Sequence, residues 1–193
     1  RLYSWAEDTD KISSEQAGFR RGFSTIDHIF TLTSIVKRKL YSKRGGKVYA
    51  AFIDYKKAFD SVNREKLWFM LQQLETSSKM IGILKAMYVS VESCVRWGAT
   101  LSDFFGCPQG VKQGCLLSPL IFSLLISKVA DEVRENGRHG SQLLPDGQEI
   151  FLLLFADDIV LLSSSPAGLQ NQINSLERAS KSLGLEVNLD KTN

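Results

Sequence analysis

The chain has 193 residues, of which 44% are hydrophobic and 23% charged, and 24 basic against 21 acidic residues give a formal net charge of +3. This composition excludes an intrinsically disordered protein, and the low net charge excludes a histone-like polycation. The length suits one large domain or two small ones. The charge is uneven, because residues 37–47 hold six of the 24 basic residues and no acidic residue.

The cysteines and the ends of the sequence indicate the compartment of the protein and the extent of the chain. Cys94, Cys107 and Cys115 form neither a C-x-x-C pair nor a zinc-like spacing with histidine, so we predict a reduced, intracellular protein without structural zinc, in either the nucleus or the cytoplasm. No apolar run is long enough to span a membrane, and no signal peptide opens the sequence. The abrupt start at Arg1 and end at Asn193 indicate a fragment of a longer polypeptide.

The first half of the chain predicts helices around one buried strand. Residues 25–40 carry apolar side chains at helical spacing, and Ser24 is a candidate N-cap. A buried strand is predicted at 48–54, followed by helices at 63–74 and 77–92. A basic turn at 42–47 precedes the strand, and the apolar face of the first helix is predicted to comprise Ile26, Ile29, Phe30, Thr33, Val36 and Leu40.

The second half predicts a hairpin between two long helices. Residues 93–97 read as a short strand, and 98–117 as a strand-and-loop segment. Ser118 and Pro119 begin a helix that runs to about residue 135, with serine as the N-cap and proline in the first helical position. The remaining predicted elements are strands at 150–155 and 159–162 joined by a tight turn at 156–158, a helix at 166–183 and a strand at 185–189.

This order of elements predicts the fold class. Strands and helices alternate irregularly, and a hairpin lies near the centre of the sequence from residue 48 onward. Such a mixture favours an α+β fold, in which an antiparallel sheet is covered by helices on one face.

Two adjacent aspartates, Asp157 and Asp158, interrupt the otherwise apolar run FLLLFADDIVLLS at 151–163. Alone, the pair is most simply an ordinary turn, because aspartate is common in turns. However, Asp54 ends the strand at 48–54, and in an α+β sheet that strand can lie beside the hairpin and bring Asp54 next to Asp157. Three converging carboxylates repel one another unless cations neutralise them, and such hard oxygen ligands suit Mg²⁺.

Five segments, in order along nearly the whole chain, resemble motifs of the reverse transcriptases encoded by non-LTR retrotransposons. The segments are QAGFRRGFSTIDHI at 16–29 (fingers), FIDYKKAFDSVNREKLW at 52–68 (first catalytic aspartate), PQGVKQGCLLSPLIFSLLI at 108–126 (template and nucleotide positioning), LLLFADDIVLLS at 152–163 (catalytic hairpin) and LGLEVNLDKT at 183–192 (lysine motif).

The resemblance implies a polymerase palm at 48–193 with partial helical fingers at 1–47, a fingers segment interleaved around 77–115, and no thumb. It implies an RNA-directed DNA polymerase, a nucleotidyltransferase that uses two Mg²⁺ ions, or Mn²⁺ in their place, to join a dNTP to a primer 3′-hydroxyl. The partners would be an RNA template, a DNA primer and dNTP, with no membrane and no obligate protein partner. Without a thumb to hold the duplex, the isolated chain is expected to be weakly active or inactive.

The resemblance also implies roles for the acidic residues and for one lysine. Asp54 and Asp157 would hold both metal ions, and Asp158 would contribute less directly. The carbonyl of Tyr55 would be a further metal ligand, and Lys191 resembles the lysine that protonates the leaving pyrophosphate.

Substrate contacts are implied at five further positions. Phe59 falls where the family places an aromatic gate beneath the sugar of the incoming nucleotide, although by residue pattern alone it is a core residue at a helix start. Gln113 and Gly114 fit the turn that lines the nascent base pair, since glycine permits close backbone approach. Arg20 and Arg21 either bind triphosphate or template phosphates or are solvated surface arginines.

Two alternative functions stay open. One is a catalytically inactive nucleic-acid-binding remnant of a truncated element, and the other is an RNA-templated RNA polymerase of the same palm architecture, against which Phe59 argues. The basic segment 37–47 likewise either contacts a nucleic-acid backbone or is a solvated linker.

Overall fold

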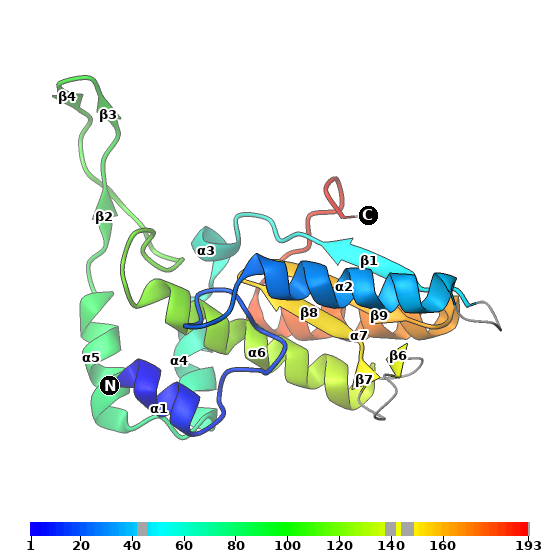
Figure 1. The fold of residues 1–193 in the computed structure, drawn as a ribbon. Helices are drawn as coiled ribbons and strands as arrows, with labels where there is room; N and C mark the ends of the chain where they lie inside the picture. The colour runs from blue at the N-terminus through cyan, green and yellow to red at the C-terminus, as the bar shows by residue number, and fades with distance from the viewer. Residues whose placement is uncertain (42–45, 138–141, 144–148, 193) are drawn as a thin grey trace.

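The structure, a computed structural model, describes residues 1–41, 46–137, 142–143 and 149–192, with the side chains of 142–143 left out (Figure 1). Its helices are α1 (Leu2–Asp8), α2 (Thr25–Leu40), α3 (Ala58–Ser61), α4 (Arg64–Gln73), α5 (Ser78–Met87), α6 (Ser118–Asn136) and α7 (Pro166–Leu183). The predicted basic turn at 42–47 lies mostly outside the described residues.

A three-stranded antiparallel sheet forms the centre of the fold. Its strands are β1 (Tyr49–Ile53), β8 (Leu152–Phe155) and β9 (Asp158–Ser163), in the order β1-β9-β8. The hairpin of β8 and β9 therefore lies with β9 in the middle, and β1 pairs with β9 from Tyr49–Ser163 to Ile53–Ile159. The predicted pairing of the first strand with the hairpin is thus confirmed.

The two faces of the sheet carry different helices. Side chains on one face, including Ile53, Leu154 and Ile159, share the main core with buried residues of α6 and α7. On the opposite face, Leu153 and Leu162 pack with Ile35 of α2 in a smaller cluster. The α+β class is confirmed, with α6 and α7 on one face as expected and α2 in addition across part of the other (Figure 1).

The helix boundaries largely follow the capping signals in the sequence. Helix α2 begins after Ser24, whose backbone N–H donates to the Asp27 carboxylate at 2.7 Å, and α7 ends at Gly184 in the left-handed conformation. The helix predicted at 77–92 ends earlier, at Met87. The predicted N-cap role of Ser118 is wrong: Leu117 occupies the N-cap, and Ser118 is a buried first-turn residue whose hydroxyl lies 3.3 Å from that of Tyr88.

The apolar face predicted for α2 is largely exposed. Ile26, Phe30 and Leu40 are 72%, 71% and 70% exposed, whereas the buried contact with the sheet is made by Ile35. The helical spacing was therefore predictive of the helix and not of the face that packs on the sheet.

A narrow arm extends from the body between α5 and α6 (Figure 1). It contains two antiparallel pairs of short strands, β2 (Glu92–Ser93) with β5 (Phe105–Gly106) and β3 (Arg96–Trp97) with β4 (Thr100–Leu101). Two further short strands, β6 (Gln142–Leu143) and β7 (Glu149–Ile150), pair with each other beyond α6.

The strand predicted at 185–189 is absent as a strand. Only a single antiparallel bridge joins Val187 to Tyr55, and the chain then turns at Leu189 and Asp190. This segment nevertheless runs beside the residues that follow β1, which places the C-terminal turn at one end of the sheet. Within the described part of the chain, no helix is both long and apolar enough to cross a membrane.

Candidate active site

The register of β1 and β9 brings two acidic residues together. Ile53 pairs with Ile159, so the next residues outward along the antiparallel strands are Asp54 and Asp158. Burial and the nearby charges of Asp157 and Asp54 raise the pKa of Asp158 above its ordinary value, while Lys191 opposes this effect. Carboxylates that are 104 residues apart in sequence therefore share one electrostatic environment.

Asp157 lies in the tight turn that joins the hairpin strands. Phe155 pairs with Asp158, which leaves a two-residue loop of Ala156 and Asp157. Ala156 has a φ of 58°, in the left-handed region that residues with a Cβ rarely adopt. The turn places one aspartate in the loop and the next at the start of β9.

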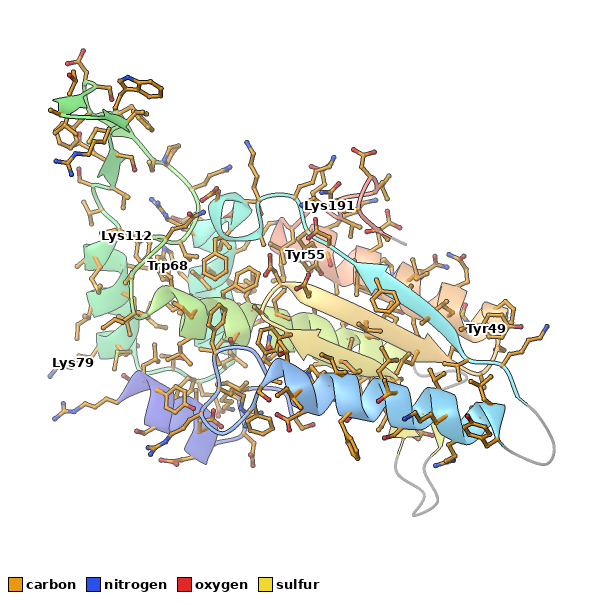
Figure 2. The ribbon with its side chains drawn as sticks, turned by 45° about the horizontal axis from the view of Figure 1, so that its top comes forward. Tyr49, Tyr55, Trp68, Lys79, Lys112 and Lys191 are labelled. Carbon is orange, nitrogen blue, oxygen red and sulfur yellow. The ribbon has the colours of Figure 1, made fainter. Side chains whose placement is uncertain are left out.

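Asp54 is held by the C-terminal segment. Its carbonyl accepts the backbone N–H of Asn188 at 2.8 Å, and its Oδ2 accepts the side-chain amide of Asn188 at 3.0 Å. Lys191 Nζ lies 3.7 Å from the same Oδ2, and its side chain is 70% exposed. Figure 2 shows Lys191 and Tyr55 at the same end of β1, opposite Tyr49.

The role of Asn188 was not predicted from the sequence. It lies within the quoted lysine motif, but the expectation of a strand at 185–189 concealed the turn that directs its side chain to Asp54. An asparagine three residues before Lys191, near a predicted sheet edge, was the available signal.

The donor chemistry of this cluster fits a hard divalent cation. Asp54, Asp157 and Asp158 supply carboxylate oxygens, and the pKa of Asp158 is raised first by burial and then by the charges of Asp157 and Asp54, a repulsion that a cation would relieve. Among the described residues, however, no group of three or more potential ligand side chains is assembled into a ready metal cage.

Tyr55, which follows Asp54, anchors this region through its side chain. The ring is buried, and the hydroxyl lies 2.6 Å from the Ser180 hydroxyl of α7. Burial raises the pKa of Tyr55. The side chain of Tyr55 therefore lies in the core. The metal ligand predicted at this position is its backbone carbonyl.

Phe59 is fixed in a stack of aromatic rings. Its ring lies parallel to that of fully buried Phe122, with centroids 4.7 Å apart, and meets Phe19 edge-on at 6.2 Å. Phe59 itself is only partly buried. The ring is therefore a core contact that is also partly exposed, and its role as a gate for the nucleotide sugar stays a prediction.

Gln113 and Gly114 lie together on an exposed turn before α6. The Gln113 side chain donates to Asp60 Oδ1 at 2.9 Å, which links this turn to α3. Gly114 has a φ of 80° and open space where a side chain would project. The left-handed conformation, and not crowding, accounts for glycine at this position.

Arg20 is used for internal contacts. Its guanidinium forms two hydrogen bonds with the Glu7 carboxylate, at 3.0 and 2.7 Å, and further ones with the carbonyls of Ser13 and Gln16. This binding ties α1 to the following loop and leaves the predicted phosphate contact of Arg20 without support. The side chain of Arg21 is exposed, so it alone of the pair is available to a ligand.

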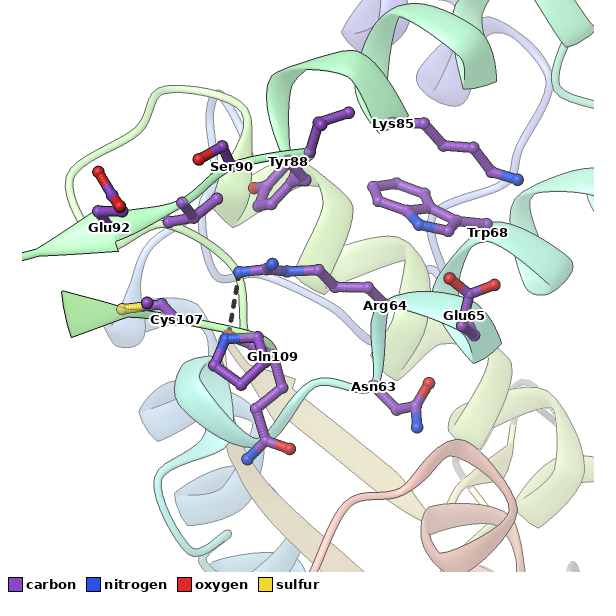
Figure 3. Close-up of a pocket in the computed structure, with 14 residues that line it drawn as sticks. Asn63, Arg64, Glu65, Trp68, Lys85, Tyr88, Ser90, Glu92, Cys107 and Gln109 are labelled. Atoms are coloured by element: carbon purple, nitrogen blue, oxygen red, sulfur yellow. Dashed lines mark hydrogen bonds between the residues drawn. The ribbon is translucent and has the colours of Figure 1, made fainter.

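Two cavities flank the segment that precedes Gln113. One, of about 840 Å³, is lined by Lys56, Lys57, Lys191 and other residues next to the carboxylates. The other, of about 740 Å³, lies around Arg64, Trp68 and Tyr88 (Figure 3).

Arg64, which carried no predicted role, supports the backbone between these cavities. It donates to the carbonyls of Gln109 and Gly110 at 3.0 and 2.8 Å and lies 5.0 Å from the centre of the Tyr88 ring (Figure 3). Nothing in the sequence indicated this role for Arg64, the one arginine of α4.

An antiparallel sheet that gathers carboxylates at one end, beside a cavity lined by lysines, has the chemistry of a metal-dependent phosphoryl-transfer site. Comparison with known proteins makes the class specific. The profile of the family "Reverse transcriptase (RNA-dependent DNA polymerase)" matches residues 2–193, and the chain belongs to this family. Members of the family generally use divalent metals.

Curated relatives come from retrotransposons. The chain is 31% identical over 187 residues to the probable RNA-directed DNA polymerase from transposon BS of Drosophila melanogaster, covering 94% of this chain and 20% of that protein. It is 27% identical over 176 residues to a Pol polyprotein from the type-1 retrotransposable element R2 of Nasonia vitripennis, covering 91% and 17%. The chain thus spans about a fifth or less of the length of these relatives.

Solved structures show the same fold. A telomerase from Candida tropicalis, in complex with a fragment of telomeric RNA, matches all of this chain and 32% of its own, with a TM-score of 0.71 and 18% identity. An apo telomerase from the same organism matches with a TM-score of 0.69 and 16% identity. At these identities the likeness concerns the fold alone.

Proposed function

We propose that the polypeptide that carries this chain is an RNA-directed DNA polymerase, which adds dNTPs to a primer 3′-hydroxyl on an RNA template. The observation that carries the proposal is the convergence of Asp54 with Asp158 and Asp157 at the end of the sheet, in a chain of the reverse transcriptase family. Phosphoryl transfer of this kind depends on positioning and on electrostatic stabilisation, and both reside in this cluster.

Asp54 and Asp157 would hold two Mg²⁺ ions, or Mn²⁺ in their place, with Asp158 in a lesser role and the carbonyl of Tyr55 as a further ligand. When bound, such ions activate the attacking hydroxyl and stabilise the leaving oxygen of an in-line displacement. The rigid register of β1 and β9 supports the constant spacing of carboxylates that this chemistry needs.

Lys191 would donate a proton to the leaving pyrophosphate. Its exposed ammonium stands 3.7 Å from Asp54 Oδ2 and lines the cavity beside the carboxylates, so it can reach a ligand that enters there. Lys56 lines the same cavity and forms an ion pair with Glu186 at 2.6 Å.

Phe59 would discriminate dNTP from rNTP, because a ring held by stacking on Phe122 cannot yield to a 2′-hydroxyl. Gln113, fixed by Asp60, and Gly114 would line the nascent base pair. Arg21 would contact phosphate through its exposed guanidinium.

The division of the chain into units follows the same proposal. Residues 1–47 would form part of the fingers and 48–193 the palm, with a fingers segment interleaved around 77–115. The arm between α5 and α6 falls within that interleaved segment and projects from the body, which supports the assignment (Figure 1).

Primer extension on an RNA template by the full polypeptide tests the proposal. Wild-type protein should incorporate dNTPs only with Mg²⁺ or Mn²⁺, and Asp157→Asn should abolish incorporation. Asp103→Asn, which changes an exposed aspartate of the arm, is the matched control and should remain active. Equal extension by Asp157→Asn would refute the proposal, and duplex binding without incorporation by wild-type protein would favour the inactive remnant.

A further inference from the structure

Gln16 is a fully buried polar residue that bonds to the turn carrying Asp157. Its side-chain oxygen accepts the backbone N–H groups of Ala156 at 3.0 Å and Gly18 at 2.7 Å. Its side-chain amide donates to the carbonyl of Ala156 at 3.2 Å. One side chain thereby satisfies both backbone polar groups of Ala156, and the residue is 140 positions away in sequence.

The segment that carries Gln16 is itself anchored along β8. The backbone N–H of Leu154 donates to the carbonyl of Glu15, and that of Ala17 donates to the carbonyl of Leu154, both at 2.9 Å. The Glu15 carboxylate is bound by Arg134 of α6 at 2.6 Å, and this hydrogen bond and ion pair help to lower the pKa of Glu15 despite its burial. Gln16 is thus presented from a fixed backbone and not from a free loop.

Ala156 needs such support for two reasons. Its left-handed φ of 58° is disfavoured for a residue with a Cβ and persists only when surrounding contacts determine it. The next two residues, Asp157 and Asp158, are like charges near Asp54, and repulsion among like charges disfavours holding the three close together. A buried amide that bonds on both sides of Ala156 opposes both effects.

The backbone of Gly18 packs closely against the turn. A Cβ placed on Gly18 would lie 2.1 Å from the backbone nitrogen of Ala156 and 2.9 Å from its Cα. The segment at 16–18 therefore meets the turn backbone to backbone, which allows the Gln16 side chain to reach Ala156 from within the core.

We propose that Gln16 is a positioning residue for catalysis, which holds Ala156 in its left-handed conformation and thereby fixes the direction of the Asp157 carboxylate. The inference rests on the proposed polymerase function, and it adds a determinant that lies outside the acidic motifs. Gln16 touches neither substrate nor metal in this role; it acts through the backbone of the turn.

The matched control is Gln172, a second fully buried glutamine. Its side-chain amide donates to the carbonyl of Leu162 at 3.0 Å, between α7 and β9 and away from the turn. Gln16→Met and Gln172→Met both remove a buried amide of the same size. Loss of turn geometry should accompany only the first change.

The kinetic experiment measures kcat and KM for dNTP in primer extension by the full polypeptide, together with Tm. Gln16→Met should lower kcat by about 100-fold, as a displacement of about 1 Å in a catalytic group can do, with KM little changed. Gln172→Met should keep kcat near wild type with a smaller loss of Tm, because the Gln172 side-chain oxygen has no hydrogen-bond partner among the described residues. Equal losses of kcat in the two variants would overturn the proposal.

The second readout is backbone amide exchange followed by NMR, which requires no activity. Gln16→Met should accelerate exchange at the Ala156 and Gly18 amides, and Gln172→Met should not. Unchanged protection of the Ala156 amide in Gln16→Met would overturn the proposed role of Gln16. If wild-type protein fails to extend a primer, the proposed function fails while exchange still decides the role of Gln16. If Gln16→Met does not fold, the test uses Gln16→Glu, which keeps the accepting oxygen. Its kcat and its amide exchange at Ala156 are then compared with those of Gln172→Glu.

Discussion

Gly18→Ala tests the closest backbone contact in the candidate site. Gly18 is not among the glycines with positive φ, so alanine can adopt its backbone conformation and the added methyl group alone decides the outcome. That carbon would lie 2.1 Å from Ala156 N, and ordinary contact begins at 3.4 Å, so the two backbones must separate by about 1.3 Å. Neither partner is a flexible side chain that could move aside.

The expected magnitudes follow from that separation. Overpacking of this kind destabilises a protein by about 1–3 kcal/mol, and each kcal/mol lowers Tm by roughly 2–4 °C at this chain length. Because the displaced backbone belongs to the turn before Asp157, the rate should fall by about 100-fold in addition. Urea denaturation measures the first effect, and primer extension at saturating dNTP measures the second.

Gly82→Ala is the control for Gly18→Ala. Gly82 lies within α5, and no atom lies within 4 Å of the position its Cβ would take. Alanine should therefore stabilise the protein by about 0.4–1 kcal/mol, through the smaller entropy of the unfolded chain, and leave extension unchanged. Wild-type stability and activity in Gly18→Ala would show that Gly18 does not lie in close contact with the Ala156 backbone.

Three further substitutions test separate parts of the site. Tyr55→Phe should lower the free energy of unfolding by about 1 kcal/mol in urea, because it leaves the buried Ser180 hydroxyl without its partner. The pKa of Asp158 is raised above its ordinary value of 3.8, so the folded state binds that proton more tightly and the charged form destabilises it at neutral pH. Asp158→Asn should therefore raise the metal-free Tm at neutral pH, and calorimetry should show this gain vanish as the pH falls through that raised pKa and below 3.8. Phe59→Val should increase rNTP incorporation relative to dNTP in a competition assay; unchanged discrimination would contradict the gate.

The sequence predicted local structure well where side chains cap or terminate helices. Helix α7 has the predicted bounds because proline stands in its first turn and Gly184 adopts the left-handed conformation at its end. Ser118 misled the prediction, because a serine before proline satisfies the capping pattern even when the core, here through Tyr88, takes up its hydroxyl. Capping signals locate a helix to within a residue but do not say which groups bind its end.

The face of α2 shows a different limit. Its apolar stripe predicted the helix correctly, yet Ile26, Phe30 and Leu40 are exposed, while Ile35 makes the buried contact with the sheet. Spacing measures which side of a helix is apolar. Which side meets a neighbour depends on the approach of segments distant in sequence, and these contacts leave no local pattern.

The convergence of Asp54 with the hairpin was predictable because strand pairing and the family motifs both required it. The fate of Arg20 was not, since a guanidinium suits a carboxylate as well as a phosphate and nothing near it in sequence identifies Glu7 as its partner. The same holds for Asn188 and Arg64, whose bonds join segments far apart in the chain.

The acidic cluster is held from two sides by neutral amides. Gln16 binds the turn before Asp157, and Asn188 binds Asp54, across 140 and 134 residues of sequence respectively. A cation could balance the repulsion among these carboxylates, but it could not fix their directions in its absence, because an ion attracts equally from any side. Amide hydrogen bonds are directional and do not depend on ion occupancy. On the proposed function, the carboxylates would therefore keep their spacing before a metal ion or nucleotide arrives, so that binding would not have to assemble the site.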